Sequence, residues 1–166
     1  AVGASGPSQV LVARGLVALS AEQLAQAQQL FAQAVAVDAT DVQACYYLAV
    51  VHERRGEHEA AISALKTALA HEPTFDLAAL DLGVLLLQRG QYRDAASWLA
   101  RAHQNESLRA KASLFQGITA LRLGDIPQAQ QHLEQAALGD VSLRPTARYH
   151  QGVIAVQDGN WQAAQA

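Results

Sequence analysis

Residues 76–102 read DLAALDLGVLLLQRGQYRDAASWLARA, and this stretch decides the fold. Apolar residues recur in it every three to four positions on both sides of Gly90, as in two amphipathic helices. No strand-like alternation competes. Gly90 follows the first helical segment, at a point where a left-handed glycine ends a helix without a Cβ clash. The stretch therefore predicts two helices joined by a glycine turn.

The turn glycine returns at a fixed interval along the chain. Gly56, Gly90, Gly124 and Gly159 are separated by 34, 34 and 35 residues. Other small residues keep the same spacing: Ala61, Ala95, Ala129 and Ala164; Gly83, Gly117 and Gly152; and Ala34, Ala68, Ala102 and Ala136. Such a period is typical of stacked repeats, in which each unit buries its apolar face against its neighbours. Because helices approach closely only at small residues, Gly83 is expected to face Ala95.

The repeats divide the chain into units. With Pro73 near the end of one unit, the frames are 8–41, 42–75, 76–109, 110–144 and a truncated 145–166. Residues 1–7 are interpreted as a flexible linker or tag remnant. The last unit stops within a helix-forming run, so we expect the chain to be a fragment of a larger protein. Residues expected to cap helices between units are Thr40, Ser107 and Ser142.

The residues at these repeating positions resemble the tetratricopeptide repeat. In one unit they are Leu82, Gly83, Gly90, Tyr92, Ala95, Leu99 and Ala102. The resemblance extends over residues 8–166 and implies an all-α fold, a right-handed superhelical solenoid of antiparallel helix pairs with about four and a half repeats. The first unit departs from the pattern. Arg14 replaces a usual apolar residue and Glu22 replaces the turn glycine, which suggests a capping repeat.

The resemblance also implies a peptide-binding groove, because in tetratricopeptide arrays the first helix of each pair lines the concave surface. The corresponding residues here are Leu16, Tyr46, Val50, Glu53, Arg54, Leu80, Val84, Leu87, Leu114, Ile118, Leu121, Arg122, Tyr149 and Val153. The ninth place of a unit is often asparagine in the family. Here it is aliphatic in all five units: Leu16, Val50, Val84, Ile118 and Val153. A clamp for a terminal carboxylate is therefore not expected.

An apolar stripe of this kind is unusual on a soluble monomer unless something covers it. We therefore predict a protein–protein interaction scaffold that binds an apolar or amphipathic peptide segment in its groove. A bacterial assembly or secretion system, or a chaperone-like adaptor, fits this prediction. Two alternatives stay open. In the first, tight curvature of the solenoid buries the apolar stripe between neighbouring helices. In the second, the chain is an oligomerisation module that self-associates through the groove or its open terminal repeat.

The sequence lacks the features of nucleic-acid-binding proteins, zinc proteins, enzymes and membrane-spanning proteins. The net charge is −3 and only two residues are lysine, so a nucleic-acid groove is not expected. The six histidines lack the spacing of a zinc site and are interpreted as structural, and no cofactor or catalytic motif is found. We therefore predict that the chain is not an enzyme. No apolar run reaches the ~20 residues of a membrane span. The compartment stays open between cytoplasm and periplasm.

Overall fold

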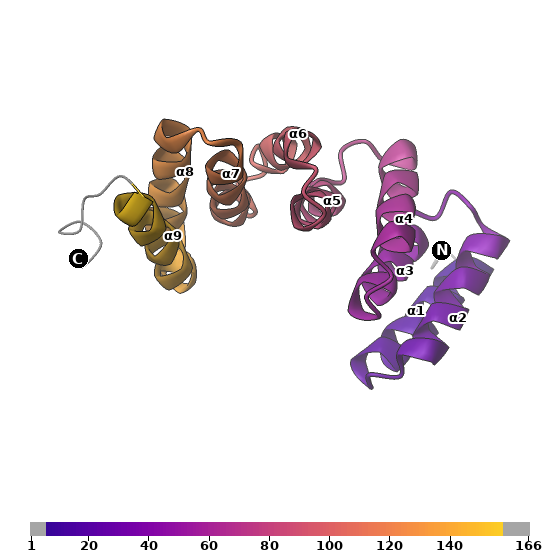
Figure 1. The fold of residues 1–166 in the computed structure, drawn as a ribbon. Helices are drawn as coiled ribbons and strands as arrows, with labels where there is room; N and C mark the ends of the chain where they lie inside the picture. Colours follow the sequence, from indigo (N-terminus) through magenta and orange to yellow (C-terminus); the bar gives the residue numbers. More distant parts are fainter. Residues whose placement is uncertain (1–5, 158–166) are drawn as a thin grey trace. The chain divides into compact units, whose positions relative to one another are not determined.

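The computed structural model describes residues 6–157 (Figure 1). These residues form nine α-helices and one short 3-10 helix, and none of them lies in a strand. The all-α fold predicted from the sequence is confirmed. The predictions at Gly159 and Ala164, and the end of the unit 145–166, lie outside the described residues.

The helices follow one another in antiparallel pairs. Their bounds are α1 (Pro7–Ser20), α2 (Leu24–Val37), α3 (Val42–Arg54), α4 (His58–His71), α5 (Asp76–Gln88), α6 (Tyr92–Ala102), α7 (Arg109–Leu123), α8 (Ile126–Gly139), the 3-10 helix η1 (Val141–Leu143) and α9 (Arg144–Gln157). Helix α1 begins at Pro7, which the sequence places in the linker. Two compact units, residues 1–78 and 79–166, divide the chain within α5, and each is described separately.

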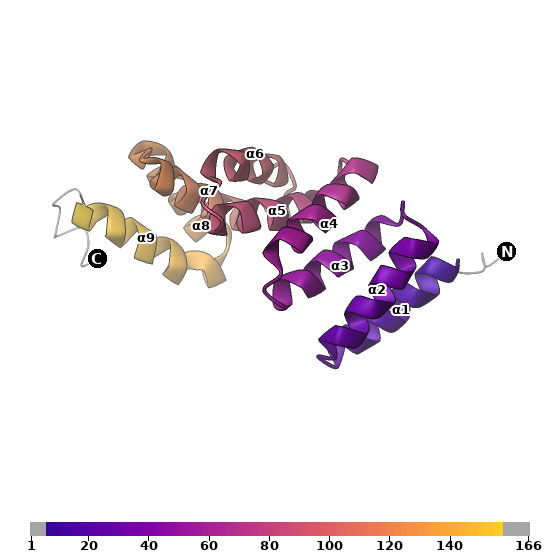
Figure 2. The ribbon, with the colours of Figure 1, turned by 45° about the vertical axis from the view of Figure 1, so that its right-hand side comes forward.

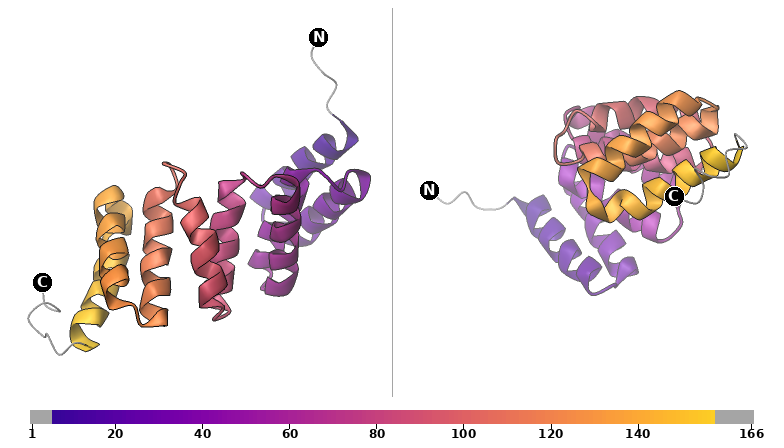
Figure 3. Two further views of the ribbon diagram at one scale, coloured as in Figure 1. Left: turned by 90° about the horizontal axis from the view of Figure 1, so that it is seen from above. Right: turned by 90° about the vertical axis from the view of Figure 1, so that its left-hand side faces the viewer.

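Each unit has an apolar core between its helices. In unit 1, α1 packs on α2 and α3 on α4 (Figure 2), with Phe31 and Val51 fully buried. In unit 2, α7 packs on α8 and α8 on α9 (Figure 3), with Leu133 and Ile154 buried. Burial of these apolar faces is what stabilises helices of this length, because short helices are marginal in water.

Three glycines at the eighth place of their units bring paired helices into close contact. A Cβ at Gly15 would lie 2.5 Å from Cε1 of Phe31, and a Cβ at Gly83 would lie 2.7 Å from Cγ of Leu99. Gly117 has the same relation to Leu133, also at 2.7 Å. The close approach predicted from the small residues is therefore present. Its partner differs, because Leu99 covers Gly83 where the sequence predicts Ala95.

The turn within each pair contains a left-handed residue. Gly56, Gly90 and Gly124 have φ of 75°, 75° and 81°, as predicted. In the first pair the same conformation falls on Glu22, at φ 57°. A side chain is strained in this region because its Cβ approaches the backbone, at a cost of about 1–2 kcal/mol.

Replacing Glu22 with glycine is expected to raise the free energy of unfolding by about 0.5–1 kcal/mol. The gain is smaller than the strain because glycine also gives the unfolded chain more freedom. Thermal unfolding followed by circular dichroism measures it. Gly56→Ala is the reverse control and should lower the free energy of unfolding by about 1 kcal/mol. An unchanged or lower midpoint for Glu22→Gly would contradict the prediction.

The connections between pairs are closed by short polar turns. Oδ1 of Asp38 accepts hydrogen bonds from the amide of Thr40 at 2.9 Å and from its hydroxyl at 2.7 Å. The same turn recurs where Asn105 accepts from Ser107 and Asp140 from Ser142. The hydroxyl residues were predicted to cap the next helix. They instead close the turn after the previous helix, and the cap of α3 is Asp41, whose side chain accepts from the amide of Ala44.

Candidate functional site

The ninth-place side chains are neither fully buried nor fully exposed. Leu16 on α1, Val50 on α3, Val84 on α5, Ile118 on α7 and Val153 on α9 are all half-buried. Leu16 and Val50 pack against the core of unit 1, and Ile118 packs against the core of unit 2. Helix α1 contacts α3, and α7 contacts α9. Within each unit, the first helices of successive pairs thus present neighbouring apolar side chains that are supported from beneath and accessible from one side.

In unit 1 this surface opens into a cavity of about 810 Å³. The cavity lies between α1 and the connection from α2 to α3, and its lining includes Val12, Leu16, Val37 and Gln43. Its volume is within the range of about 300–1,000 Å³ that is usual for ligand sites. Leu16 was predicted to line a binding surface, and it lies in the wall of this cavity.

Two carboxylates stand at the edge of the cavity. Asp41 caps α3 by accepting from the amide of Ala44 at 3.0 Å, and it also accepts a hydrogen bond from the hydroxyl of Ser8. The hydroxyl and then the amide of Thr40 hold the pKa of Asp38 below its usual value. Asp38 is therefore ionised at neutral pH, and it adds negative charge to the lining of the cavity.

The other predicted residues of unit 1 lie along α3. The ring of Tyr46 makes edge-on contacts with Tyr47 and Phe75, with centroid distances of 5.3 and 5.0 Å. Glu53 is half-buried and Arg54 is exposed at the end of the helix. Tyr46 is therefore fixed by an aromatic cluster, whereas Arg54 stands in solvent.

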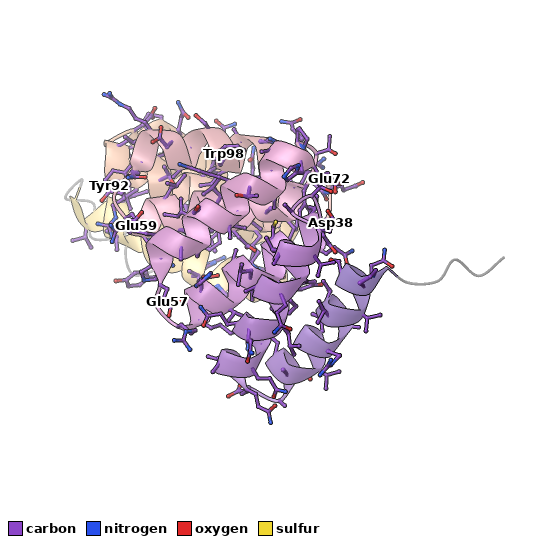
Figure 4. All side chains as sticks on the ribbon, turned by 90° about the vertical axis from the view of Figure 1, so that its right-hand side faces the viewer. Asp38, Glu57, Glu59, Glu72, Tyr92 and Trp98 are labelled. Atoms are coloured by element: carbon purple, nitrogen blue, oxygen red, sulfur yellow. The ribbon has the colours of Figure 1, made fainter. Side chains whose placement is uncertain are left out.

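The turn from α3 to α4 is held by ionic contacts. Oε2 of Glu57 lies 2.5 Å from Nδ1 of His52, and Oε1 accepts from Nε of Arg55 at 2.7 Å. Hydrogen bonds from Arg55 and then His52 lower the pKa of Glu57. Figure 4 shows Glu57 at the opposite end of unit 1 from Asp38. His52 thus has a structural contact in this turn, in keeping with the interpretation from the sequence.

In unit 2 the predicted residues lie at different depths. Leu80 and Leu114, at the fifth place, are buried. Four others are half-buried: Val84, Leu87, Ile118 and Leu121. A fully buried side chain offers no contact area to a ligand, so Leu80 and Leu114 support the surface from below. The accessible part of the predicted stripe consists of the ninth- and twelfth-place residues.

Helix α9 carries an exposed aromatic residue of the predicted set. Tyr149 is 68% exposed, and its ring lies edge-on to His150 at a centroid distance of 5.2 Å. Val153, one turn later, is half-buried, and Arg122 at the end of α7 is exposed. Tyr149 and Val153 therefore form an accessible apolar strip on α9.

Two histidines of unit 2 have lowered pKa values. Burial is the main cause for His103, followed by the charges of His132 and Arg109. Burial is also the main cause for His150, followed by the charge of Arg122. The unfolded chain therefore takes up these protons at a higher pH than the folded chain does, so acid favours unfolding.

The free energy of unfolding is accordingly expected to fall as the pH drops through 6.5, the ordinary histidine value, and to level off below the lowered folded pKa values. Urea unfolding at about pH 7.5 and about pH 5 measures the change. The double variant His103→Asn, His150→Asn should lose less stability between the two conditions. An equal loss in both proteins would show that other groups cause it.

Within residues 6–157, no three histidine, cysteine or acidic side chains come together as metal ligands. Cys45 is buried, and burial raises the pKa of its thiol, which disfavours the reactive thiolate. None of the described helices is long and apolar enough to span a bilayer.

Comparisons with known proteins agree with the repeat architecture. Two family models described as tetratricopeptide repeat match, one over residues 53–114 and one over 12–70 and 114–166. The solved structure of MamA 41-end from Desulfovibrio magneticus RS-1 has a TM-score of 0.89 at 16% identity, covering 98% of this chain and 92% of that one. Comparison with curated protein sequences gave no match.

Two further solved structures are similar. That of pilF from Pseudomonas aeruginosa has a TM-score of 0.82 at 20% identity, covering 95% of this chain and 72% of that one. That of YrrB, described as a TPR protein with an unusual peptide-binding site, has a TM-score of 0.81 at 19% identity, with coverages of 93% and 79%. At these identities the likeness concerns the fold.

Proposed function

Since the chain belongs to the tetratricopeptide repeat family, we propose that it is a protein–protein interaction scaffold whose first helices bind an apolar or amphipathic peptide segment. The observation that carries the proposal is the aliphatic ninth place, half-buried in all five units. Half-buried side chains are held in position by the core, and they still have solvent-accessible surface that a bound ligand can cover. Covering about 400 Å² of such surface would contribute on the order of 10 kcal/mol before the costs of association.

The negative charge at the cavity of unit 1 indicates which polar residues the ligand carries. Asp38 and Asp41 stand beside the apolar wall formed by Val12 and Leu16. A segment with apolar residues on one face and a lysine or arginine at the edge complements this arrangement. Charges at the rim of an interface mainly set orientation and association rate. The proposed ligand is therefore an amphipathic segment with basic rather than acidic polar residues.

Synthetic amphipathic helices test the proposal. A fluorescently labelled 16-residue peptide of leucine and lysine is expected to bind the full chain, and the corresponding leucine–glutamate peptide is expected to bind more weakly. Val50→Asp should weaken binding of the lysine peptide at least tenfold, because it places a charge in the apolar strip. Leu138→Asp is the matched control, since Leu138 is exposed and lies outside the proposed surface.

Because Val50 is half-buried, Val50→Asp could also weaken binding by unfolding the chain. Helical content is therefore measured by circular dichroism for each variant. Tyr149→Ser changes an exposed side chain that makes little demand on the core, and it should weaken binding in unit 2 without loss of helix. Undiminished binding in folded Val50→Asp and Tyr149→Ser would refute the proposed surface.

The proposal extends to the setting of this function. They include proteins of Desulfovibrio magneticus and Pseudomonas aeruginosa, and the YrrB structure is described as having a peptide-binding site. A bacterial assembly or secretion system, or a chaperone-like adaptor, is consistent with a scaffold of this fold. Self-association through the same surface is the second candidate. Sedimentation over a concentration series distinguishes it, because a persistent monomer would leave only the scaffold.

A further inference from the structure

Unit 2 contains buried polar groups between its helices that the proposed binding surface does not use. Within residues 6–157, five buried side-chain nitrogen or oxygen atoms have no hydrogen-bond partner. Three of the five are Nε2 of His103, Oε1 of Gln116 and Nδ1 of His132. His103 directly follows α6, Gln116 lies on α7 and His132 lies on α8. A buried polar atom without a partner costs free energy, so several of them in neighbouring helices indicate a ligand.

Contacts within unit 2 link the three residues. Helix α7 packs on both α6 and α8 (Figure 1). The rings of His103 and His132 are edge-on to one another, with a centroid distance of 6.3 Å. His132 and Gln116 line one cavity of about 410 Å³ between α6, α7 and α8. This cavity gives a small ion and its water molecules a path to the cluster.

The two histidines replace apolar residues of the repeat. His103 holds the twenty-eighth place of its repeat, and His132 holds the twenty-third place of the next one. The earlier repeats have only apolar residues at the corresponding pairs of places: Val35 and Ala64, then Leu69 and Trp98. Histidine therefore occurs at both places together, and only where the two rings meet. Packing of the repeat does not require it, because apolar side chains serve at the other positions.

The unpartnered atoms of the cluster are suited to bind a cation. Gln135 makes a side-chain hydrogen bond with the ring of His103. Since Nε2 has no partner, this bond involves Nδ1. With the amide oxygen of Gln135 as acceptor, Nδ1 holds the proton and Nε2 carries the lone pair of the neutral ring. Histidines that bind metals are usually oriented by such a hydrogen bond to their other nitrogen.

The spacing of the two rings fits one shared metal ion. Zinc binds imidazole nitrogen at about 2.0–2.1 Å, so two imidazoles on one ion have ring centroids about 5–6 Å apart. The distance of 6.3 Å between His103 and His132 is slightly longer, and rotation of the two side chains closes the difference. Imidazole ligands favour zinc, copper or nickel, whereas magnesium and calcium favour oxygen ligands.

We propose that His103 and His132 bind a divalent transition-metal ion of the zinc type through Nε2 and Nδ1, with Oε1 of Gln116 as a third ligand and water from the cavity completing the coordination. Asp125, directly before α8, lines the same cavity and adds negative charge that favours a cation. Arg109 acts on His103 with the opposite charge and limits the affinity. The ion joins the end of α6 to α7 and α8, so it stabilises unit 2 independently of the proposed peptide surface.

Zinc chloride is the probe, titrated into the full chain without a histidine tag and followed by calorimetry. We expect one zinc ion per chain and no heat from magnesium chloride. His103→Leu and His132→Ala should each weaken zinc binding about tenfold or more, as loss of a ligand or of its supporting contact does. Both variants should fold, because earlier repeats have leucine and alanine at these places. Circular dichroism checks their helical content.

Matched variants separate the site from other histidines and from a purely structural role. His71→Ala removes an exposed histidine elsewhere and should leave zinc binding unchanged. Gln135→Ala should weaken it about tenfold through the orientation of His103, and Gln116→Leu about threefold. Zinc should also raise the thermal unfolding midpoint of the unchanged chain, and it should not raise that of His103→Leu.

The proposal is overturned if the unchanged chain gives no heat with zinc. It is also overturned if folded His103→Leu and His132→Ala bind zinc as the unchanged chain does, since other groups then hold the ion. His103→Leu should bind the leucine–lysine peptide normally, so failure of the metal site and failure of the proposed function are distinguishable.

Discussion

Replacing Phe31 with alanine is expected to lower the free energy of unfolding by about 3–5 kcal/mol. Phe31 is fully buried, and its ring fills the space opposite Gly15, which has no Cβ to occupy it. The ring also stacks on Tyr47 at a centroid distance of 5.6 Å. Its removal leaves a cavity between α1, α2 and α3. Gly15 has no side chain that could move into this cavity.

Urea unfolding monitored by circular dichroism measures this loss, and binding of the peptide probes at the same temperature shows whether the folded state is retained. Val37→Ala on the same helix is the matched control, because Val37 is 55% exposed and its truncation should change the free energy of unfolding by less than about 0.5 kcal/mol. A loss below about 1.5 kcal/mol for Phe31→Ala would mean that the pair of helices closes over the cavity.

Replacing Gly117 with valine is expected to cost about 3 kcal/mol, at the upper end of the range for overpacked cores. The added Cβ would lie 2.7 Å from Cγ of Leu133 and 3.1 Å from its backbone nitrogen. Leu133 is fully buried and has little room to turn away. Helices α7 and α8 must therefore separate, and apolar contact along the whole pair is lost.

Gly152 provides a control at the same place of the next unit. No described side chain lies within 4 Å of a Cβ built there. Gly152→Val should therefore change the free energy of unfolding by less than about 0.5 kcal/mol, since valine and glycine differ little in helix propensity. Equal losses at the two positions would show that the cost at Gly117 comes from the helix itself rather than from contact with Leu133.

The candidate site could be predicted only in part. The ninth-place residues could be named because their place in the repeat is fixed, and all five are half-buried; their part in binding stays a prediction. The fifth place was less regular, since Leu80 is buried and Tyr149 is exposed. The acidic edge of the cavity in unit 1 was missed. Its available signal was Asp41 directly before a helical segment, where Thr40 had been favoured as the cap.

The exposure of Val10 and Val17 on α1 was also missed, although the two residues have the spacing of an apolar helical stripe. In every other unit the same stripe belongs to the core. The sequence pattern is therefore identical for a covered and an uncovered face, and only the exposure of Val17 distinguishes them.

The amino-acid order by itself determined the helix pairs, the left-handed turns at Gly56, Gly90 and Gly124, and the aliphatic ninth place, because each depends on backbone sterics and on periods of 3.6 and 34 residues that are local to the chain. Tertiary structure alone decided that Leu99 covers Gly83, that Leu80 is buried while Tyr149 is exposed, and that no described helix covers Val17. These outcomes depend on which element packs over a residue, and that element lies elsewhere in the sequence.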